Sequence, residues 1–185
     1  MDNEEIKAGY VRVSQVIAPY VDYSHINQEV LAAKAAIGTE VHSAIESHYL
    51  QEFFPISLKA QEYIPSFKAA LHDSWFSTLK HEMLEERMYH ETLKLTGQID
   101  MLAVDEDGKK WLIDFKTTAQ ANLKVWKIQM AMYVLLLANN GVDHIQGVRI
   151  LHLKKKAAYS LIPVSLSEAD MNIAFYLIKA YWHFK

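Results

Sequence analysis

Two apolar segments, residues 97–104 and 110–117, constrain the fold of this chain more than any other feature of its sequence. Each has the length of a β-strand, and only a short polar stretch with the sequence Asp105–Glu–Asp–Gly108 and one lysine separates them. Because an Asp-Gly pair favours a tight primed turn, we expect the two segments to form a hairpin. Charged residues interrupt both strands, and they are Asp100, Asp114 and Lys116. The hairpin should bring these groups together, with Asp114 and Lys116 on one face of their strand.

Helical and strand-like segments surround this hairpin. Apolar residues recur at helical spacing over 27–52, where Asn27 can cap the helix. The other expected elements are one or two helices over 58–80 with a break at Pro65, a strand over 83–95, an apolar helix over 123–139, a hairpin of 146–153 and 157–164, and a closing helix over 167–183 capped by Ser167. This order predicts an α/β or α+β fold in which helices pack on a sheet.

Length and composition limit the classes of function. A chain of 185 residues, 51% of them hydrophobic, fits one domain over 1–185, with a mainly helical part over 1–80 and a sheet core over 81–185. The absence of cysteine excludes disulfides, thiolate zinc sites, iron–sulfur clusters and a cysteine nucleophile. The sequence contains no membrane span and no signal or transit peptide, so we expect a cytoplasmic location in a bacterial or phage-infected cell.

Charge is distributed unevenly along the chain. The formal net charge of −3 at first argues against a nucleic-acid partner. However, residues 1–93 hold 7 basic and 14 acidic residues, whereas residues 94–185 hold 12 basic and 8 acidic ones. Lysine outnumbers arginine by 16 to 3, and lysine suits point contacts to phosphate better than the reading of base edges. The second half therefore hints at sequence-independent contact with a polyanion.

Two carboxylates and a lysine in one patch have a definite chemical use. Hard divalent cations such as Mg²⁺ prefer oxygen ligands of this kind. A bound cation polarises a phosphoryl oxygen and lowers the pKa of its water ligand, while Lys116 could orient that water or stabilise the negative charge of the transition state. An Asp-x-Lys pair alone is more often a solvated strand end. The interpretation therefore depends on residues elsewhere in the chain.

Other residues accompany the hairpin. They are the small residue Gly38 and His42 one helical turn apart, Glu46 a turn later, Glu85, and the polar pair Gln129 and Tyr133 at helical spacing. Singly, each is more readily explained by packing or solvation. In this order, however, they resemble the PD-(D/E)XK nuclease superfamily: Gly-x-x-x-His, then Glu, Gly-x-x-Asp, Asp-x-Lys-Thr and Gln-x-x-x-Tyr. The similarity is greatest to the RecB-like exonuclease branch, including mitochondrial genome maintenance exonuclease-like proteins and small phage and bacterial exonucleases.

The resemblance implies a restriction-endonuclease-like α/β fold, with a central mixed sheet flanked by helices and an N-terminal helical region. The metal ligands that it implies are His42, Asp100, Asp114, the main-chain carbonyl of Phe115, and Glu85. The catalytic residues that it implies are Lys116, Asp114, Asp100 and Glu85. Near the DNA it implies Gln129, Tyr133 and Thr117. Where the superfamily's name has Pro-Asp this chain has Ile99-Asp100, and it lacks the cysteines of the relatives that hold an iron–sulfur cluster.

A mechanism follows as a hypothesis from the resemblance. One or two Mg²⁺ or Mn²⁺ ions would activate a water that attacks the scissile phosphate of DNA with a free end, leaving a 5′ phosphate on the product. Exonuclease action on a single strand, in repair, recombination or replication, ranks above endonuclease action, and unwinding would need a partner protein. Candidate backbone contacts are Lys124, Lys127 and the Lys154–Lys156 turn, and candidate stacking residues are Tyr20 and Tyr23.

Two other classes of function remain open at this point. One is a catalytically silent nuclease-fold module that binds DNA or a recombination partner, although such a module has no physical need for His42, Asp100, Asp114 and Lys116. The other is a metal-dependent hydrolase of small phosphate esters, which would be indifferent to DNA.

Overall fold

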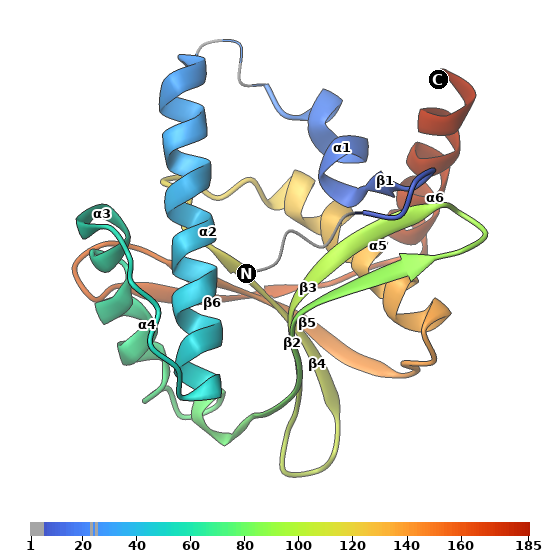
Figure 1. Ribbon diagram of the computed structural model, residues 1–185. Coiled ribbons are helices and arrows are strands. Elements are labelled where there is room, and N and C mark those ends of the chain that lie inside the picture. The colour runs from blue at the N-terminus through green and yellow to red at the C-terminus, as the bar shows by residue number, and fades with distance from the viewer. Residues whose placement is uncertain (1–5, 23, 25) are drawn as a thin grey trace.

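A mixed sheet flanked by helices forms the centre of the molecule (Figure 1). The computed structural model describes residues 6–22, 24 and 26–185. The helices are α1 (Val13–Ile17), η1 (Ala18–Tyr20), α2 (Gln28–Leu50), α3 (Leu58–Gln61), α4 (Ile64–Ala70), η2 (Phe76–Thr78), α5 (Leu123–Asn139) and α6 (Glu168–His183). The strands are β1 (Val11–Arg12), β2 (Lys80–His90), β3 (Leu95–Val104), β4 (Lys110–Lys116), β5 (Ile145–Leu153) and β6 (Tyr159–Val164).

Strand β3 is the hub of the six-stranded sheet. The order is β1-β3-β4-β5-β6, and β2 also pairs with β3. Antiparallel pairs join β2 to β3, β3 to β4 and β5 to β6, whereas β1–β3 and β4–β5 are parallel. The long crossover between the parallel strands β4 and β5 contains α5, as parallel pairing requires. The predicted central mixed sheet is therefore confirmed.

The helices cover the sheet in two layers. Apolar residues of α1, α5 and α6 pack with β3–β5 into one core, and those of α2, α3 and α4 pack into a second core on the other face. Figure 1 shows α1, α5 and α6 gathered on one side and α2 to α4 on the other. Within the described residues, no helix is both long and apolar enough to cross a membrane.

Capping explains where the long helices begin. The Asn27 side chain accepts hydrogen bonds from the backbone N–H groups of Glu29 and Val30, and α2 ends at Leu50, before Gln51 with its φ of 58°. At α6, Ser167 and Asp170 form a capping box. Both predicted N-caps are confirmed, and α5 spans the predicted residues 123–139.

Several predicted boundaries differ from the structure. Pro65 lies in the first turn of α4, where its missing N–H costs nothing, so it begins a helix instead of breaking one. Strand β2 begins at Lys80 and ends at His90, before the predicted end at residue 95. The β3–β4 connection is not a primed turn, because Gly108 alone has a positive φ, of 78°, in a five-residue loop. The short elements β1, α1 and η1 were not predicted.

Candidate active site

The predicted site lies where β3 and β4 separate. Backbone pairing of these strands runs from Val104–Lys110 to Met101–Ile113 and stops there. Asp100 and Asp114 occupy the next opposed positions. The Asp100 Oδ2 atom accepts a 2.7 Å hydrogen bond from the Phe115 backbone N–H, so a side chain takes over where the ladder ends. The hairpin thus brings the two aspartates together, as the sequence predicts.

Helix α2 brings His42 to this fork. Its Nδ1 lies 2.9 Å from Glu85 Oε1 and 3.5 Å from Asp100 Oδ1, and its Nε2 lies 3.0 Å from the Phe115 carbonyl oxygen. Potential ligand atoms of His42, Glu85 and Asp100 all lie within 4.8 Å of one another. Glu46, one turn further along α2, is not part of this group. The structure therefore brings four of the five predicted metal ligands into direct contact.

Asp114, the fifth, lies beside this group with Lys116. Its side chain is 1% exposed, and its Oδ2 lies 2.5 Å from the Lys116 Nζ. Apart from this ion pair, neither carboxylate oxygen accepts a hydrogen bond from any residue that the structure describes. Burying a carboxylate with a single ion-pair partner is costly, and its remaining lone pairs are available to a cation.

The charges of the cluster shift one another's pKa values. Burial lowers the pKa of His42, but the carboxylates of Asp100 and Glu85 outweigh burial and hold that pKa well above its usual value. Burial and the charge of Asp100 raise the pKa of Glu85, against hydrogen bonds from His42 and Gln98. Burial also opposes ionisation of Asp100, yet His42, Lys116 and the Phe115 N–H bring its pKa below the usual value.

The pKa of Asp114 is strongly raised. Burial raises its pKa to about 7, Lys116 opposes that rise, and the neighbouring charge of Asp100 adds to it. The donor set is rich in oxygen: it combines three carboxyl groups, those of Glu85, Asp100 and Asp114, with the imidazole of His42. Such a set fits a hard divalent cation. The residues present therefore fit the metal that the sequence implies.

The comparison with protein families supports the same interpretation. The family model of the PD-(D/E)XK nuclease superfamily matches residues 19–175, which is most of the chain. The chain belongs to the PD-(D/E)XK nuclease superfamily. The mixed sheet with flanking helices is the restriction-endonuclease-like fold of this superfamily, so the predicted fold class is confirmed.

A solved structure with a TM-score above 0.5 shares this fold at low sequence identity. A Eubacterium rectale protein named "Putative exonuclease" has a TM-score of 0.61 and 11% identity, over 100% of this chain and 84% of that chain. The structure of SSO0001 has a TM-score of 0.47 and 11% identity, over 97% of this chain and 78% of that chain. No curated protein matches the sequence.

Two glycines of the superfamily pattern allow close approaches around the site. A Cβ on Gly97 would lie 2.8 Å from Cε1 of Tyr133 and 2.9 Å from Cδ1 of Leu136, so this glycine lets α5 pack directly on β3. A Cβ on Gly38 would lie 3.4 Å from Thr117 Oγ1, which brings α2 close to the segment after β4. Thr117 therefore lies against the helix that carries His42.

The Gln129–Tyr133 pair on α5 lies near the carboxylates of the candidate site. The Gln129 amide donates a 3.0 Å hydrogen bond to the Tyr133 hydroxyl. Burial, reinforced by the charges of Asp100 and Asp114, holds the pKa of Tyr133 well above its usual value. Tyr133 is 7% exposed, so it lies in the core, where the charges of the carboxylates reach its hydroxyl.

The predicted DNA-backbone contacts differ in availability. Lys124 is exposed, whereas the Lys127 Nζ lies 2.9 Å from Asp170 Oδ2. In the turn after β5, Lys155 pairs with Glu62, and the Lys154 carbonyl accepts a hydrogen bond from Ser66. Tyr20 is 53% exposed, and Tyr23 lies outside the described residues. Lys124 is therefore better placed than Lys127 to reach a phosphate.

Sequence reasoning missed three polar residues around the site. Gln98 donates to Glu85, and Arg87 donates to Gln98. The buried His152 lies 2.6 Å, through its Nε2, from the Thr118 carbonyl oxygen and so holds the segment that follows Lys116. None of these residues belongs to a motif of the sequence, and their contacts follow only from the strand register.

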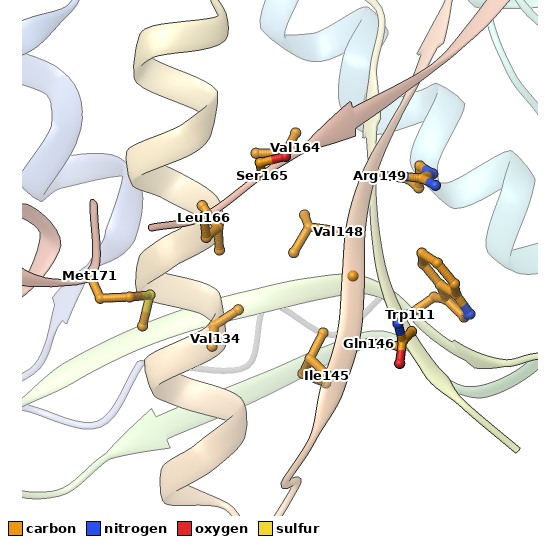
Figure 2. Close-up of a pocket in the computed structure, with 11 residues that line it drawn as sticks. Trp111, Val134, Ile145, Gln146, Val148, Arg149, Val164, Ser165, Leu166 and Met171 are labelled. Atoms are coloured by element: carbon orange, nitrogen blue, oxygen red, sulfur yellow. The ribbon is translucent and has the colours of Figure 1, made fainter. Parts of the chain in front are cut away.

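A separate hollow lies at the other end of β4. It has a volume of about 550 Å³ and lies along residues 145–147 of β5, which extend beyond the pairing with β6 that ends at Val148–Val164 (Figure 2). Figure 2 shows apolar side chains of α5 and α6 on one side and Trp111 with Arg149 on the other. None of the predicted site residues lines it.

Proposed function

We propose that this chain is a metal-dependent deoxyribonuclease that acts as an exonuclease on single strands without sequence specificity. The observation that carries the proposal is the buried Asp114 carboxylate, which among the described residues is held by Lys116 alone and lies beside the His42–Glu85–Asp100 group. Residues 1–185 would act as one nuclease domain. Cytoplasmic DNA repair, recombination or replication, in a bacterial or phage-infected cell, would be its setting.

The metal would be held by His42, Glu85, Asp100, Asp114 and the Phe115 carbonyl. When bound, Mg²⁺ or Mn²⁺ supplies Lewis acidity toward the phosphate and toward water. The ammonium of Lys116, held against Asp114, orients the attacking water or stabilises the charge that develops on the phosphate. His42 and Glu85, whose Nδ1 and Oε1 atoms lie 2.9 Å apart, would face the ion together. Tyr133 and Gln129 keep the carboxylates fixed from behind.

A free strand would be held through its phosphates. Lys124, at the start of α5, and Thr117, beside Gly38, are the proposed contacts near the fork, with a smaller part for Lys127 because Asp170 already holds its ammonium. Contacts of this kind carry no base specificity. A protein partner in recombination or replication would supply any unwinding.

The test uses oligonucleotides labelled at one end, single- or double-stranded, with Mg²⁺, Mn²⁺ or EDTA. We expect cleavage only with metal, and release of the labelled end before internal fragments. Lys116→Ala and Asp114→Ala should remove cleavage, while Lys109→Ala, an exposed lysine in the β3–β4 loop, should retain it. If wild type cleaves no DNA under any condition, the catalytically silent DNA-binding module becomes the better interpretation. If it hydrolyses a generic phosphodiester without regard to DNA, the hydrolase of small phosphate esters becomes the better one.

A further inference from the structure

A chain of hydrogen bonds leads away from the candidate metal ligands along the β2–β3 pair. The Gln98 Nε2 donates a 2.9 Å hydrogen bond to Glu85 Oε2, and the Arg87 Nη2 donates a 3.1 Å hydrogen bond to Gln98 Oε1. The other carboxylate oxygen of Glu85, Oε1, faces His42. One oxygen of Glu85 is therefore held from outside while the other faces the site.

The chemistry of the three groups fixes the orientation of the amide between them. A guanidinium only donates hydrogen bonds, and an ionised carboxylate only accepts them. The Gln98 side chain must therefore point its oxygen at Arg87 and its nitrogen at Glu85. Arg87 and Gln98 are cross-strand partners in the β2–β3 register, so the backbone holds them opposite each other.

The backbone conformation of Glu85 indicates that contacts with neighbouring residues hold this residue in place. Its φ is 48°, in the left-handed region that a non-glycine residue rarely adopts inside a strand. Pairing of β2 with β3 keeps its register on both sides, at Leu84–Met101 and Glu86–Ile99, but skips Glu85 itself. A conformation of this cost persists only where surrounding contacts hold it, and Gln98 and His42 are the side chains bonded to its carboxylate.

We propose that Gln98 and Arg87 are positioning residues, which fix the Glu85 carboxylate so that its Oε1 atom and the His42 ring are set for a divalent cation before DNA arrives. The proposal rests on the proposed function, since it concerns the same site. Arg87 acts through Gln98 and has no direct contact with the ligands. Outer hydrogen-bond partners of metal ligands typically change metal affinity by about 10- to 100-fold when removed.

The experiment measures Mn²⁺ binding to the DNA-free protein, by the EPR signal of free Mn²⁺ and by calorimetry. Gln98→Met keeps the length of the side chain but loses both hydrogen bonds, and we expect its Kd for Mn²⁺ to rise about tenfold. Arg87→Met should raise the Kd less, and Arg87→Lys, which still donates, should stay close to wild type. In the Gln98→Met background, Arg87→Met should add nothing, because its only route to Glu85 is already lost.

Glu86→Gln provides the matched control. This neighbouring residue of β2 is exposed and lies outside the chain of hydrogen bonds, so its loss should leave Mn²⁺ affinity unchanged. Melting of each metal-free variant shows whether a weaker Kd follows from general destabilisation. A Kd for Gln98→Met within twofold of wild type, or equal losses from Arg87→Met with and without Gln98, would overturn the positioning role. Wild-type protein that binds no Mn²⁺ would instead refute the proposed function itself.

Discussion

The Asp100 carboxylate accepts a 2.7 Å hydrogen bond from the Phe115 backbone N–H, where pairing of β3 with β4 stops. Asp100 thus replaces a backbone acceptor and also faces His42. Asp100→Asn keeps an acceptor oxygen for this N–H, whereas Asp100→Ala leaves a buried donor without a partner. Because such a loss costs about 1–3 kcal/mol, Asp100→Ala should unfold more easily than Asp100→Asn by that amount in urea. Both should lose metal-dependent cleavage. Equal unfolding free energies would show that the hydrogen bond contributes nothing to stability.

Glu85 offers a test of backbone strain at the site. Its φ of 48° suits glycine, which has no Cβ, better than alanine. Both Glu85→Gly and Glu85→Ala remove the carboxylate, so the difference between them isolates the backbone. We expect the glycine variant to be more stable than the alanine variant by about 1 kcal/mol, although both lose Mn²⁺ affinity. Glu86→Gly against Glu86→Ala, one residue further, should show the opposite order.

Asp114 makes the stability of the metal-free protein depend on pH. Folding raises its pKa to about 7. The folded state is therefore favoured while Asp114 is protonated, and that advantage is lost as pH rises through about 7. In EDTA, the free energy of unfolding of Asp114→Asn relative to wild type should rise by more than about 1 kcal/mol between pH 5 and pH 8. One pKa unit corresponds to about 1.4 kcal/mol. Added Mg²⁺ should stabilise wild type but not the variant, and a pH-independent difference in EDTA would contradict the assignment.

Gly97 and Gly38 belong to the same sequence pattern but should respond differently to alanine. A Cβ at position 97 would meet the ring of Tyr133 at 2.8 Å, inside the core, so Gly97→Ala should cost about 1–3 kcal/mol. A Cβ at position 38 would meet only the end of the Thr117 side chain, at 3.4 Å, and alanine favours a helix. Gly38→Ala should therefore match or exceed wild type in urea denaturation. A tolerated Gly97→Ala would mean that α5 shifts freely on β3.

Lys124 and Lys127 should contribute unequally to DNA binding. Lys124 is exposed, while Lys127 already pairs with Asp170. With cleavage removed by Lys116→Ala, we expect Lys124→Ala to reduce the salt dependence of single-strand binding by about 0.7 in slope, the effect of one lost phosphate contact. Lys127→Ala should reduce it less. Fluorescence anisotropy over a range of salt concentrations measures both slopes, and equal slopes would show that the ion pair opens on DNA.

The sequence predicted the parts of the fold that carry strong local periodicity. The helix over 123–139 and the hairpin strands are mostly apolar, so burial makes them visible without knowledge of their neighbours. Strand β1 was not predicted because a strand of two residues is too short to show a periodic pattern. Its partner is also distant, since the pairing of Val11 with Leu95 spans most of the first half of the chain.

For the site, the sequence predicted residue identities better than physical environments. The hairpin brings Asp100 close to Asp114, which strand spacing alone could predict. The burial of Asp114, the left-handed backbone of Glu85 and the Gln98–Arg87 hydrogen bonds depend on register and on packing between distant segments. The catalytic and ligand roles of these residues remain predictions.

The origin of the site residues on separate elements also bears on when the protein can act. His42, Glu85, Asp100 and Asp114 come from α2, β2, β3 and β4, so an unfolded chain cannot gather them. A cation that binds only the folded chain stabilises it, by about 2.7 kcal/mol at a concentration one hundred times Kd. Thermodynamic linkage of this kind would tie nuclease competence to completed folding. A nascent or partly unfolded chain would hold no metal and leave nearby DNA intact.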